Sequence, residues 1–409
     1  MASATWPEVR IGDLGSVLTG RTPPTAHPGY FGSDFPFITP GDMRQGRQAR
    51  DTQRSLSHEG AALLTRLQIP ANSVCVSCIG WQMGEIIMTD RPSFTNQQIN
   101  SIVTNGQVDP SFLYYSIRPR KAELLSLGAA IGVRTPILKK SSFCELRVKL
   151  PPLLTQKKIA AVLSAYDDLL ERNNRRIEHA GAMLRWLYGG WFEKFQFPGQ
   201  PRSATGGDAM PDGWRVVSLQ DVASLQRGIE PGSNAYVGLG PGDVIPFLRV
   251  GDLSVRQSRL GIQKDLTYGC TVTPLEIVMS FDGTPGIVRV GLTGAFSSGI
   301  RKIVPSDPDM GWAFLYCLLQ SDRIQDVIRA HSRGTTIVHA GSAIPFLTAL
   351  LPPKSLMNRF EAIGRPLLEF QINIQALNSV LRTTRDFLSP RLISGELDVS
   401  DLDIPEAVA

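Results

Sequence analysis

Apolar residues recur at alternating steps of four and three between Thr155 and Trp191. This spacing is typical of a helix that buries a narrow seam against a second helix. Charged residues between the seam positions, such as Asp167 and Glu171, are expected on a solvated outer face. We therefore predict a long spacer helix within residues 154–197. Its predicted seam is Ile159, Leu163, Tyr166, Leu170, Asn173, Ile177, Ala180, Leu184, Leu187 and Trp191.

The chain before this helix, residues 1–153, alternates short apolar segments with turns and predicts a β-rich domain. Buried strands are predicted at residues 73–80 and 94–103, and residues 109–127 have helical spacing. Two prolines at 151 and 152 end the domain and open the long helix, because proline is tolerated in a first helical turn. After the helix, the Gly- and Pro-rich residues 198–213 predict a linker.

The sequence then repeats itself. Residues 214–221 match residues 6–13, and residues 245–252 match residues 35–42. The tripeptides Phe-Leu-Tyr and Leu-Pro-Pro also recur, at a nearly constant offset. We infer an internal duplication, with a second β-rich domain at residues 214–351.

The second copy also ends in a helical pattern, residues 352–395, followed by a tail, residues 396–409. Pairing the two helices is the simplest way to bury both seams, and the approximate two-fold symmetry of a duplication makes the pair antiparallel. The alternative is that each helix packs only on its own domain. The predicted fold class is α+β: two mixed, β-rich globular domains separated by two long antiparallel coiled-coil helices. The second predicted seam is Phe360, Ile363, Leu367, Phe370, Ile374, Leu377, Leu381, Thr384 and Leu388.

Composition adds limits on the class of protein. Hydrophobic residues make up 42% of the 409 residues and charged residues 19%, as in ordinary globular proteins. The sequence has no apolar run of about 18 residues, so we predict no membrane span. The N-terminus does not resemble a secretory signal. Five cysteines are too few for a disulfide framework, which favours the cytoplasm. The net charge of +5 is compatible with a polyanionic partner.

Common catalytic motifs are missing from the sequence. There is no Gly-Lys dipeptide and hence no Walker A loop, and no acidic residue has a lysine two positions later, as in restriction-type nucleases. The Pro-Pro-aromatic pattern of adenine methyltransferases is also absent. Cys75 and Cys78 have metal-like spacing, but three residues apart on a strand they face opposite sides, so we predict buried thiols. We expect neither a catalytic nor a metal site.

Arginines cluster at matching places in the two repeats, around residues 44–54 and 249–264. Arginine can bind guanine edges or phosphates through two hydrogen bonds, so the clusters predict polyanion recognition. A solvated basic face is the alternative. The polar loops at residues 95–98 and 334–339 could read base edges or cap turns. The predicted DNA contacts are Arg21, Thr22, Arg44, Arg47, Gln82, Asn96, Gln97, Arg134, Lys139, Arg227, Arg249, Arg256, Arg301, Arg333, Thr335 and Thr336.

These segments together resemble the specificity subunit of type I DNA restriction–modification systems over nearly the whole chain. In one segment, residues 77–84, many relatives have a short turn with Ser and Arg. Here that segment contains Trp81 and Gln82, which either contribute DNA contacts or fill the core. The resemblance rests on residues 6–21, 35–42, 112–115, 150–159, 173–176, 191–192 and 385–395.

The resemblance implies two target-recognition domains that each read one half of a split DNA sequence, held apart by conserved spacer helices. It implies assembly with two methyltransferase subunits and with restriction subunits that translocate and cut DNA. S-adenosylmethionine, ATP and magnesium would belong to those partners, with no cofactor on this chain. The expected function is a non-catalytic subunit that binds DNA and directs adenine methylation or cleavage in phage defence. The alternatives are the specificity part of a related methylase–nuclease system and a coiled-coil scaffold that does not bind DNA.

Overall fold

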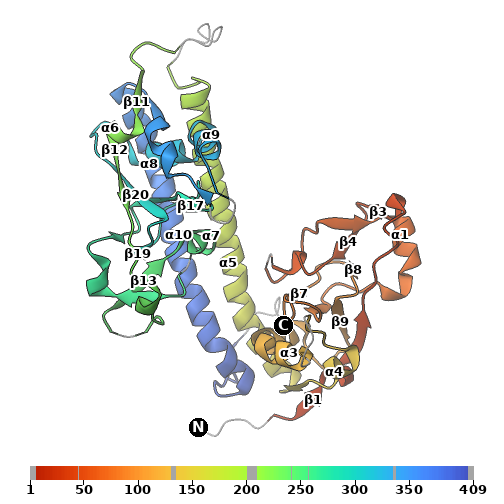
Figure 1. Ribbon diagram of the computed structural model, residues 1–409. Coiled ribbons are helices and arrows are strands. Elements are labelled where there is room, and N and C mark those ends of the chain that lie inside the picture. The colour runs from red at the N-terminus through yellow and green to blue at the C-terminus, as the bar shows by residue number, and fades with distance from the viewer. Residues whose placement is uncertain are drawn as a thin grey trace. The chain divides into compact units, whose positions relative to one another are not determined.

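The computed structural model describes residues 6–44, 46–129, 135–199, 210–240, 242–256, 258–334 and 338–403. The chain forms two compact units. The first comprises Met1–Arg172 and Val380–Ala409, and the second comprises Asn173–Ser379. Each unit contains one β-rich domain and parts of two long helices (Figure 1). The mixed α+β fold class predicted from the sequence is confirmed.

The first unit contains two four-stranded sheets and a separate strand pair, β1 (Glu8–Arg10) with β10 (Arg147–Lys149). Strands pair antiparallel in the first sheet, whereas β4 and β8 in the second sheet are parallel. The first sheet has the order β2 (Gly15–Thr19), β9 (Ile99–Thr104), β6 (Val74–Ser77) and β7 (Ile86–Met88). The second has the order β3 (Phe31–Gly32), β5 (Arg54–Leu56), β4 (Phe35–Ile38) and β8 (Phe94–Thr95). The single strand predicted at residues 94–103 is therefore two strands, from different sheets, with a turn between them.

Helices cover the first sheet and complete the core of this unit. Asp109 begins α2 (Pro110–Ile117) by accepting a hydrogen bond from the Phe112 amide (2.9 Å), and Pro110 fits the first turn. The predicted helix at residues 109–127 is α2 followed by a 3₁₀ turn and α3 (Lys121–Gly128). Phe112 packs in one buried cluster with Ile159 and Leu392 from the long helices. The remaining helices are α1 (His58–Leu63) and α4 (Lys140–Cys144).

The second unit repeats the topology of the first sheet and the parallel strand pair of the second. Its first sheet has the order β12 (Ala223–Arg227), β20 (Ile300–Pro305), β16 (Ile277–Ser280) and β18 (Val288–Arg289). Its second has the order β14 (Gly261–Gln263), β13 (Val244–Leu248), β19 (Gly294–Phe296) and β15 (Thr271–Val272), with β13 and β19 parallel as β4 and β8 are. Two strand pairs and four helices complete it: β11 (Arg215–Ser218) with β22 (Thr348–Leu351), β17 (Asp282–Gly283) with β21 (Val338–His339), α6 (Leu219–Val222), α7 (Val250–Val255), α8 (Trp312–Gln320) and α9 (Asp322–Ala330).

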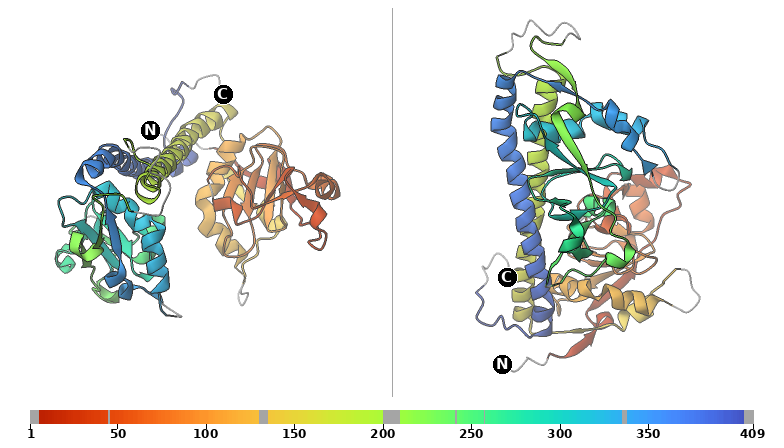
Figure 2. Two further views of the ribbon diagram at one scale, coloured as in Figure 1. Left: turned by 90° about the horizontal axis from the view of Figure 1, so that it is seen from above. Right: turned by 60° about the vertical axis from the view of Figure 1, so that its left-hand side comes forward.

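The long helices are α5 (Leu153–Tyr188) and α10 (Lys354–Ser394), and a π-helical segment, Gly189–Glu193, continues α5. Within the second unit the two helices run antiparallel (Figure 2). Asn173 donates to Asn378 (2.8 Å), whereas further along α5 the Leu184 side chain lies against Gly364. The pairing of the two helices agrees with the prediction, and Asn173 is buried at the seam as expected.

The seam of α5 follows its predicted positions, but that of α10 does not. Along α5, Leu163, Leu170 and Leu184 are buried, and Tyr166 and Ile177 are partly buried. On α10, Ile374 and Leu381 are partly buried. Ile363, Phe370 and Leu377 are 41–43% exposed, so these three seam assignments are wrong. The residues that face α5 lie one position later and are small or polar: Gly364, Gln371, Asn378 and Arg385.

Candidate nucleic-acid interface

Several loops of the first unit meet at one end of the sheet β2-β9-β6-β7. Strand pairing places Thr19 opposite Asn100, and Ser77 opposite Ile99. Strands β2 and β6 therefore end where β9 begins, and residues 20–22, 78–85 and 96–98 leave the sheet together. Residues 135–139 join them through hydrogen bonds from the Gly80 amide to Pro136 (2.9 Å) and from the Leu138 amide to Cys78 (2.8 Å). We call these four segments the first loop end.

Gly20 allows two of these loops to touch. A Cβ atom at this position would lie 2.2 Å from the carbonyl oxygen of Thr95, which excludes any larger residue without a shift of the backbone. Next to it, the Arg21 amide donates to Thr95 (2.9 Å), and the Thr22 hydroxyl donates to the Gln97 side chain (2.7 Å). The structure thus brings together four residues that the sequence singled out: Arg21, Thr22, Asn96 and Gln97.

These four residues differ in whether their polar side chains are free to bind a ligand. Arg21 is exposed, makes no side-chain hydrogen bond or ion pair with the described residues, and lines a groove with residues 62–67. Gln97 is exposed as well. Asn96 is buried. Its side-chain amide donates to the Gln98 side chain (3.0 Å) and accepts from the Gln98 backbone amide (3.1 Å). Asn96 therefore stabilises its turn, which was the alternative interpretation of this loop.

Arg44 and Gln82 form a second pair at the first loop end. With its amide oriented to satisfy both atoms, Gln82 donates to the Pro40 carbonyl (3.1 Å) and accepts from Arg44 Nη2 (3.2 Å). The turn that carries Arg44 is held by the buried Asp42 carboxylate, which accepts from the Thr39 amide (2.8 Å). Arg44 and Lys139 are both exposed. Arg134, also a predicted contact, lies outside the described residues.

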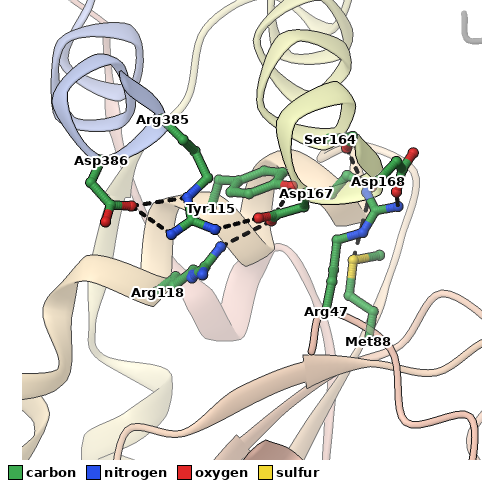
Figure 3. Close-up of polar contacts among 10 residues, drawn as sticks. Arg47, Met88, Tyr115, Arg118, Ser164, Asp167, Asp168, Arg385 and Asp386 are labelled. Carbon is green, nitrogen blue, oxygen red and sulfur yellow. Dashed lines mark hydrogen bonds and ion pairs between the residues drawn. The ribbon is translucent and has the colours of Figure 1, made fainter. Parts of the chain in front are cut away.

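Arg47 corrects the prediction of a DNA contact. Its guanidinium donates to Ser164 Oγ (2.6 Å) and Asp168 Oδ1 (2.7 Å) on α5, and its side chain is only 17% exposed (Figure 3). Because the Arg47 guanidinium is already paired with the Asp168 carboxylate, it is not available to bind a phosphate or a base. Arg47 therefore fastens the β-rich domain to α5.

The second unit has an equivalent end. Pairing places Arg227 opposite Arg301 and Ser280 opposite Ile300, so residues 228–230, 281–287 and 297–299 leave the sheet together. We call these segments the second loop end. Gly228 repeats the role of Gly20, because a Cβ atom there would lie 2.3 Å from the carbonyl oxygens of Phe296 and Ser297.

The matching hydrogen bonds identify a loop that sequence reasoning missed. The Ile229 amide donates to Phe296 (3.0 Å), as the Arg21 amide does to Thr95, so residues 296–299 are the counterpart of residues 95–98. In this loop Ser298 Oγ donates to Glu230 Oε1 (2.5 Å). Counting the repeat offset forward from Thr95 would have pointed to it. Thr335 and Thr336, which the sequence favoured instead, lie outside the described residues.

The predicted basic residues of the second unit only partly gather at this end. Arg227 is exposed on its strand, and Arg249 follows β13, whose Leu248 carbonyl accepts from Ser297 (2.9 Å). Arg333 is exposed, and its backbone pairs in both directions with His339 of β21. Arg256 lies instead at the C-terminal end of α7, near Arg289 rather than beside the loops.

The Arg301 guanidinium already makes contacts within the protein. It donates to the Ser298 carbonyl (2.5 Å) and lies over the Phe281 ring, 5.8 Å from its centroid. Burial and the neighbouring positive charge of Arg227 lower its pKa, although the group stays charged near neutral pH. On the adjacent strands, His339 Nδ1 lies 2.8 Å from Asp282 Oδ1. The second loop end therefore mixes positive, acidic and hydroxyl groups.

The two closely spaced cysteines lie in the core, and the part of the chain that the structure describes contains no metal-binding cluster. No three His, Cys, Asp or Glu residues there are placed to hold a metal ion. Cys75 and Cys78 are buried, as predicted, and burial raises the pKa of each thiol to about 12. Of the described helices, none has the length and apolar content needed to cross a membrane.

Comparison with known proteins finds similarity to specificity subunits of type I restriction enzymes. A family model for the Type I restriction modification DNA specificity domain matches residues 3–179. The chain is 26% identical over 419 residues to the type I restriction enzyme MjaIX specificity subunit of Methanocaldococcus jannaschii, which covers 97% of this chain and 94% of that protein. Over 190 residues it is 33% identical to the HindI specificity subunit of Haemophilus influenzae, covering 45% of this chain and 41% of that one.

A solved structure supports the same fold. The S subunit of a type I restriction–modification system from M. genitalium superposes with a TM-score of 0.60 at 17% identity, covering 95% of this chain and 96% of that chain. Low identity limits this likeness to the fold, whereas the sequence matches show similarity to specificity subunits. Both agree with the duplicated domains and long helices described above. The chain therefore resembles type I restriction–modification specificity subunits in sequence and in fold.

Proposed function

We propose that this chain is a non-catalytic DNA-binding subunit that reads a double-stranded target in two halves. The observation that carries the proposal is the repetition of one loop end in the two units. In both, loops leave the same end of an antiparallel four-stranded sheet around a glycine in close backbone contact. Two copies of one module suit a bipartite target, with one half-site for each unit.

The chemistry of both ends suits a nucleic acid. Exposed cations such as Arg21 and Arg44 can neutralise phosphates, which gives affinity without sequence preference. Amide and hydroxyl groups such as Gln97 and Ser298 can bond base edges, which gives sequence preference. The long helices α5 and α10 would act as the spacer that sets the separation of the half-sites, at roughly one helical turn of DNA.

The reaction itself would belong to partner subunits in the cytoplasm. We propose assembly with two methyltransferase subunits, which would bind S-adenosylmethionine and methylate adenine, and with restriction subunits that use ATP and magnesium. The outer faces of the helices support docking of other proteins. In the second unit, Ile363, Phe370 and Leu377 follow one another at heptad spacing on α10 with 41–43% exposure, and Trp186 on α5 is 77% exposed. An apolar stripe of this kind usually marks an interaction surface.

DNA titration of the complex with its methyltransferase subunits tests the proposal. We expect binding that weakens steeply with salt, with preference for one split sequence over random duplex. Methylation mapping of the host with and without this gene should then show the loss of one bipartite methylated sequence. If the complex assembles but binds no duplex even at low salt, the scaffold alternative holds instead.

A further inference from the structure

Trp81 is the most exposed large apolar side chain among the described residues, at 80%. It lies in the loop 78–85 of the first loop end, where the sequence left open whether it fills the core. The structure excludes that role. Its indole makes no hydrogen bond or ring contact with the described residues, so nothing within them accounts for an exposed tryptophan.

The loop is built to hold this side chain outward. Gly80 and Gly84 both have a φ of +84°, which other residues rarely adopt, and the Met83 amide donates to the Gly80 carbonyl (3.0 Å) to close a tight turn. The Gly84 amide donates to Ser77 (2.9 Å) and returns the loop to the sheet. Met83 itself is fully buried in the core of the unit. The turn therefore points Met83 inward and leaves Trp81 in solvent.

The surroundings of Trp81 combine a positively charged side chain with polar amide groups. Gln82, the next residue of the turn, accepts a hydrogen bond from the exposed Arg44. The backbone amide of Cys78, at the start of the loop, donates to the Gln98 carbonyl (2.8 Å). The loop therefore adjoins the loop that carries Gln97. An apolar ring beside an exposed cation and amide groups fits a ligand that combines phosphates with flat, apolar bases.

The second unit lacks this side chain. Its equivalent loop closes with the Gly286 amide on Ser280 (2.8 Å), as Gly84 does on Ser77, and is one residue shorter. Its two glycines at 283 and 286 also have positive φ, and Thr284 is exposed at the tip. The two loop ends therefore share a tight turn with two glycines of positive φ, but the first exposes Trp81 at this turn and the second exposes Thr284.

We propose that Trp81 packs its indole against the DNA of the half-site read by the first unit, as an apolar contact to a thymine methyl group or a base step. Inserted apolar side chains and contacts with thymine methyl groups are two ways in which proteins read a duplex. The contact would be specific to one half-site, because Thr284 offers no comparable surface. This proposal rests on the proposed DNA-binding function and names a mode of contact within it.

The test compares Trp81→Ala and Trp81→Phe in the complex assembled with its methyltransferase subunits. Trp81→Ala should weaken binding of the target duplex at least about tenfold, with an unchanged salt slope because no charge is lost, whereas Trp81→Phe should keep most of the affinity. Thermal unfolding should not change, since the side chain is exposed. Leu154→Ala, which removes a side chain that is 60% exposed at the start of α5, serves as the control and should leave binding unchanged.

Substitution of single thymines by uracil then distinguishes the two modes of contact. If uracil at one position weakens DNA binding by the wild type but not by Trp81→Ala, Trp81 contacts the thymine methyl group at that position. If no position behaves in this way, Trp81 contacts a base step. If Trp81→Ala binds DNA like the wild type, the inference is wrong and the proposed function stands. If it loses the methyltransferase subunits instead, Trp81 belongs to a protein interface. A wild-type complex that binds no DNA overturns the function and the inference together.

Discussion

Arg385 of α10 donates to Asp167 of α5 at 2.5 Å, and both side chains are nearly buried. The same carboxylate accepts hydrogen bonds from the Tyr115 hydroxyl (2.8 Å) and from Arg118 (2.9 Å) of the β-rich domain (Figure 3). Burial alone would lower the pKa of Arg385, but Asp167 and Asp386 outweigh it and raise the pKa. Asp167 therefore joins both long helices to the first domain through one charged group.

Removal of Arg385 should be costly. Arg385→Ala leaves a buried carboxylate with fewer partners, so we expect the free energy of unfolding to fall by about 2–4 kcal/mol. Arg382→Ala removes an exposed arginine from the same helix and should change stability by less than about 0.5 kcal/mol. Urea denaturation followed by circular dichroism measures both. Equal effects of the two substitutions would show that the Asp167 contacts add no stability.

The buried pair Asn173 and Asn378 should couple the two helices. Asn173 Nδ2 donates to Asn378 Oδ1 (2.8 Å), and Asn378 donates in turn to Asn174 (3.0 Å). A double-mutant cycle with Asn173→Ala and Asn378→Ala should give a coupling free energy of about 0.5–1.5 kcal/mol. A value near zero, measured by urea denaturation, would mean that the pair contributes no direct interaction.

Glu361 should make stability depend on pH in a defined direction. Its carboxylate accepts from the Phe314 (2.8 Å) and Ala313 (3.2 Å) amides at the start of α8, yet burial raises its pKa. A raised pKa in the folded state adds stability below the unfolded pKa and loses it as pH rises through the folded pKa. Glu361→Gln keeps an acceptor oxygen without a charge. Its stability relative to the wild type should therefore increase between about pH 4 and about pH 7.

Denaturation of both proteins at the two pH values checks this prediction, because contributions from other carboxyl groups cancel in the difference. A difference that stays constant, or that favours the wild type at the higher pH, would contradict it.

Arg21 and Arg47 should separate DNA binding from stability. Arg21→Ala removes an exposed charge, so we expect weaker DNA binding, a salt slope reduced by about 1, and unchanged folding. Arg47→Ala breaks the bonds to Ser164 and Asp168, so stability should fall by about 1–2 kcal/mol with the salt slope unchanged. Fluorescence anisotropy of the assembled complex at several salt concentrations measures the slope. The opposite assignment of effects would restore Arg47 as a DNA contact.

The sequence predicted what depends on periodicity and repetition. The seam of α5 could be read because apolar residues such as Leu163 and Leu170 occupy it. The seam of α10 could not, because Gln371 and Asn378 occupy core positions while apolar neighbours such as Phe370 lie outside. Asp167 was expected on a solvated face, but its burial depends on partners from α2 and α10 that no local pattern shows.

The loop ends were only partly predictable for a related reason. Residue type pointed to Arg21 and Gln97, but their proximity follows from strand pairing between segments about 80 residues apart, as in Thr19 with Asn100. Arg47 has the same residue type as Arg44, and only the position of Asp168 distinguishes a structural arginine from an exposed one. Ser298 was missed because its loop does not match residues 95–98 in sequence.

Exchange of one β-rich domain tests whether each unit reads its own half-site. Residues 214–350 are replaced by the corresponding domain of another specificity subunit, and the methylated sequences of the host are mapped by sequencing. We expect one half of the bipartite target to change while the half read by the first unit stays the same. A change in both halves, or in neither, would contradict the assignment of one half-site to each unit.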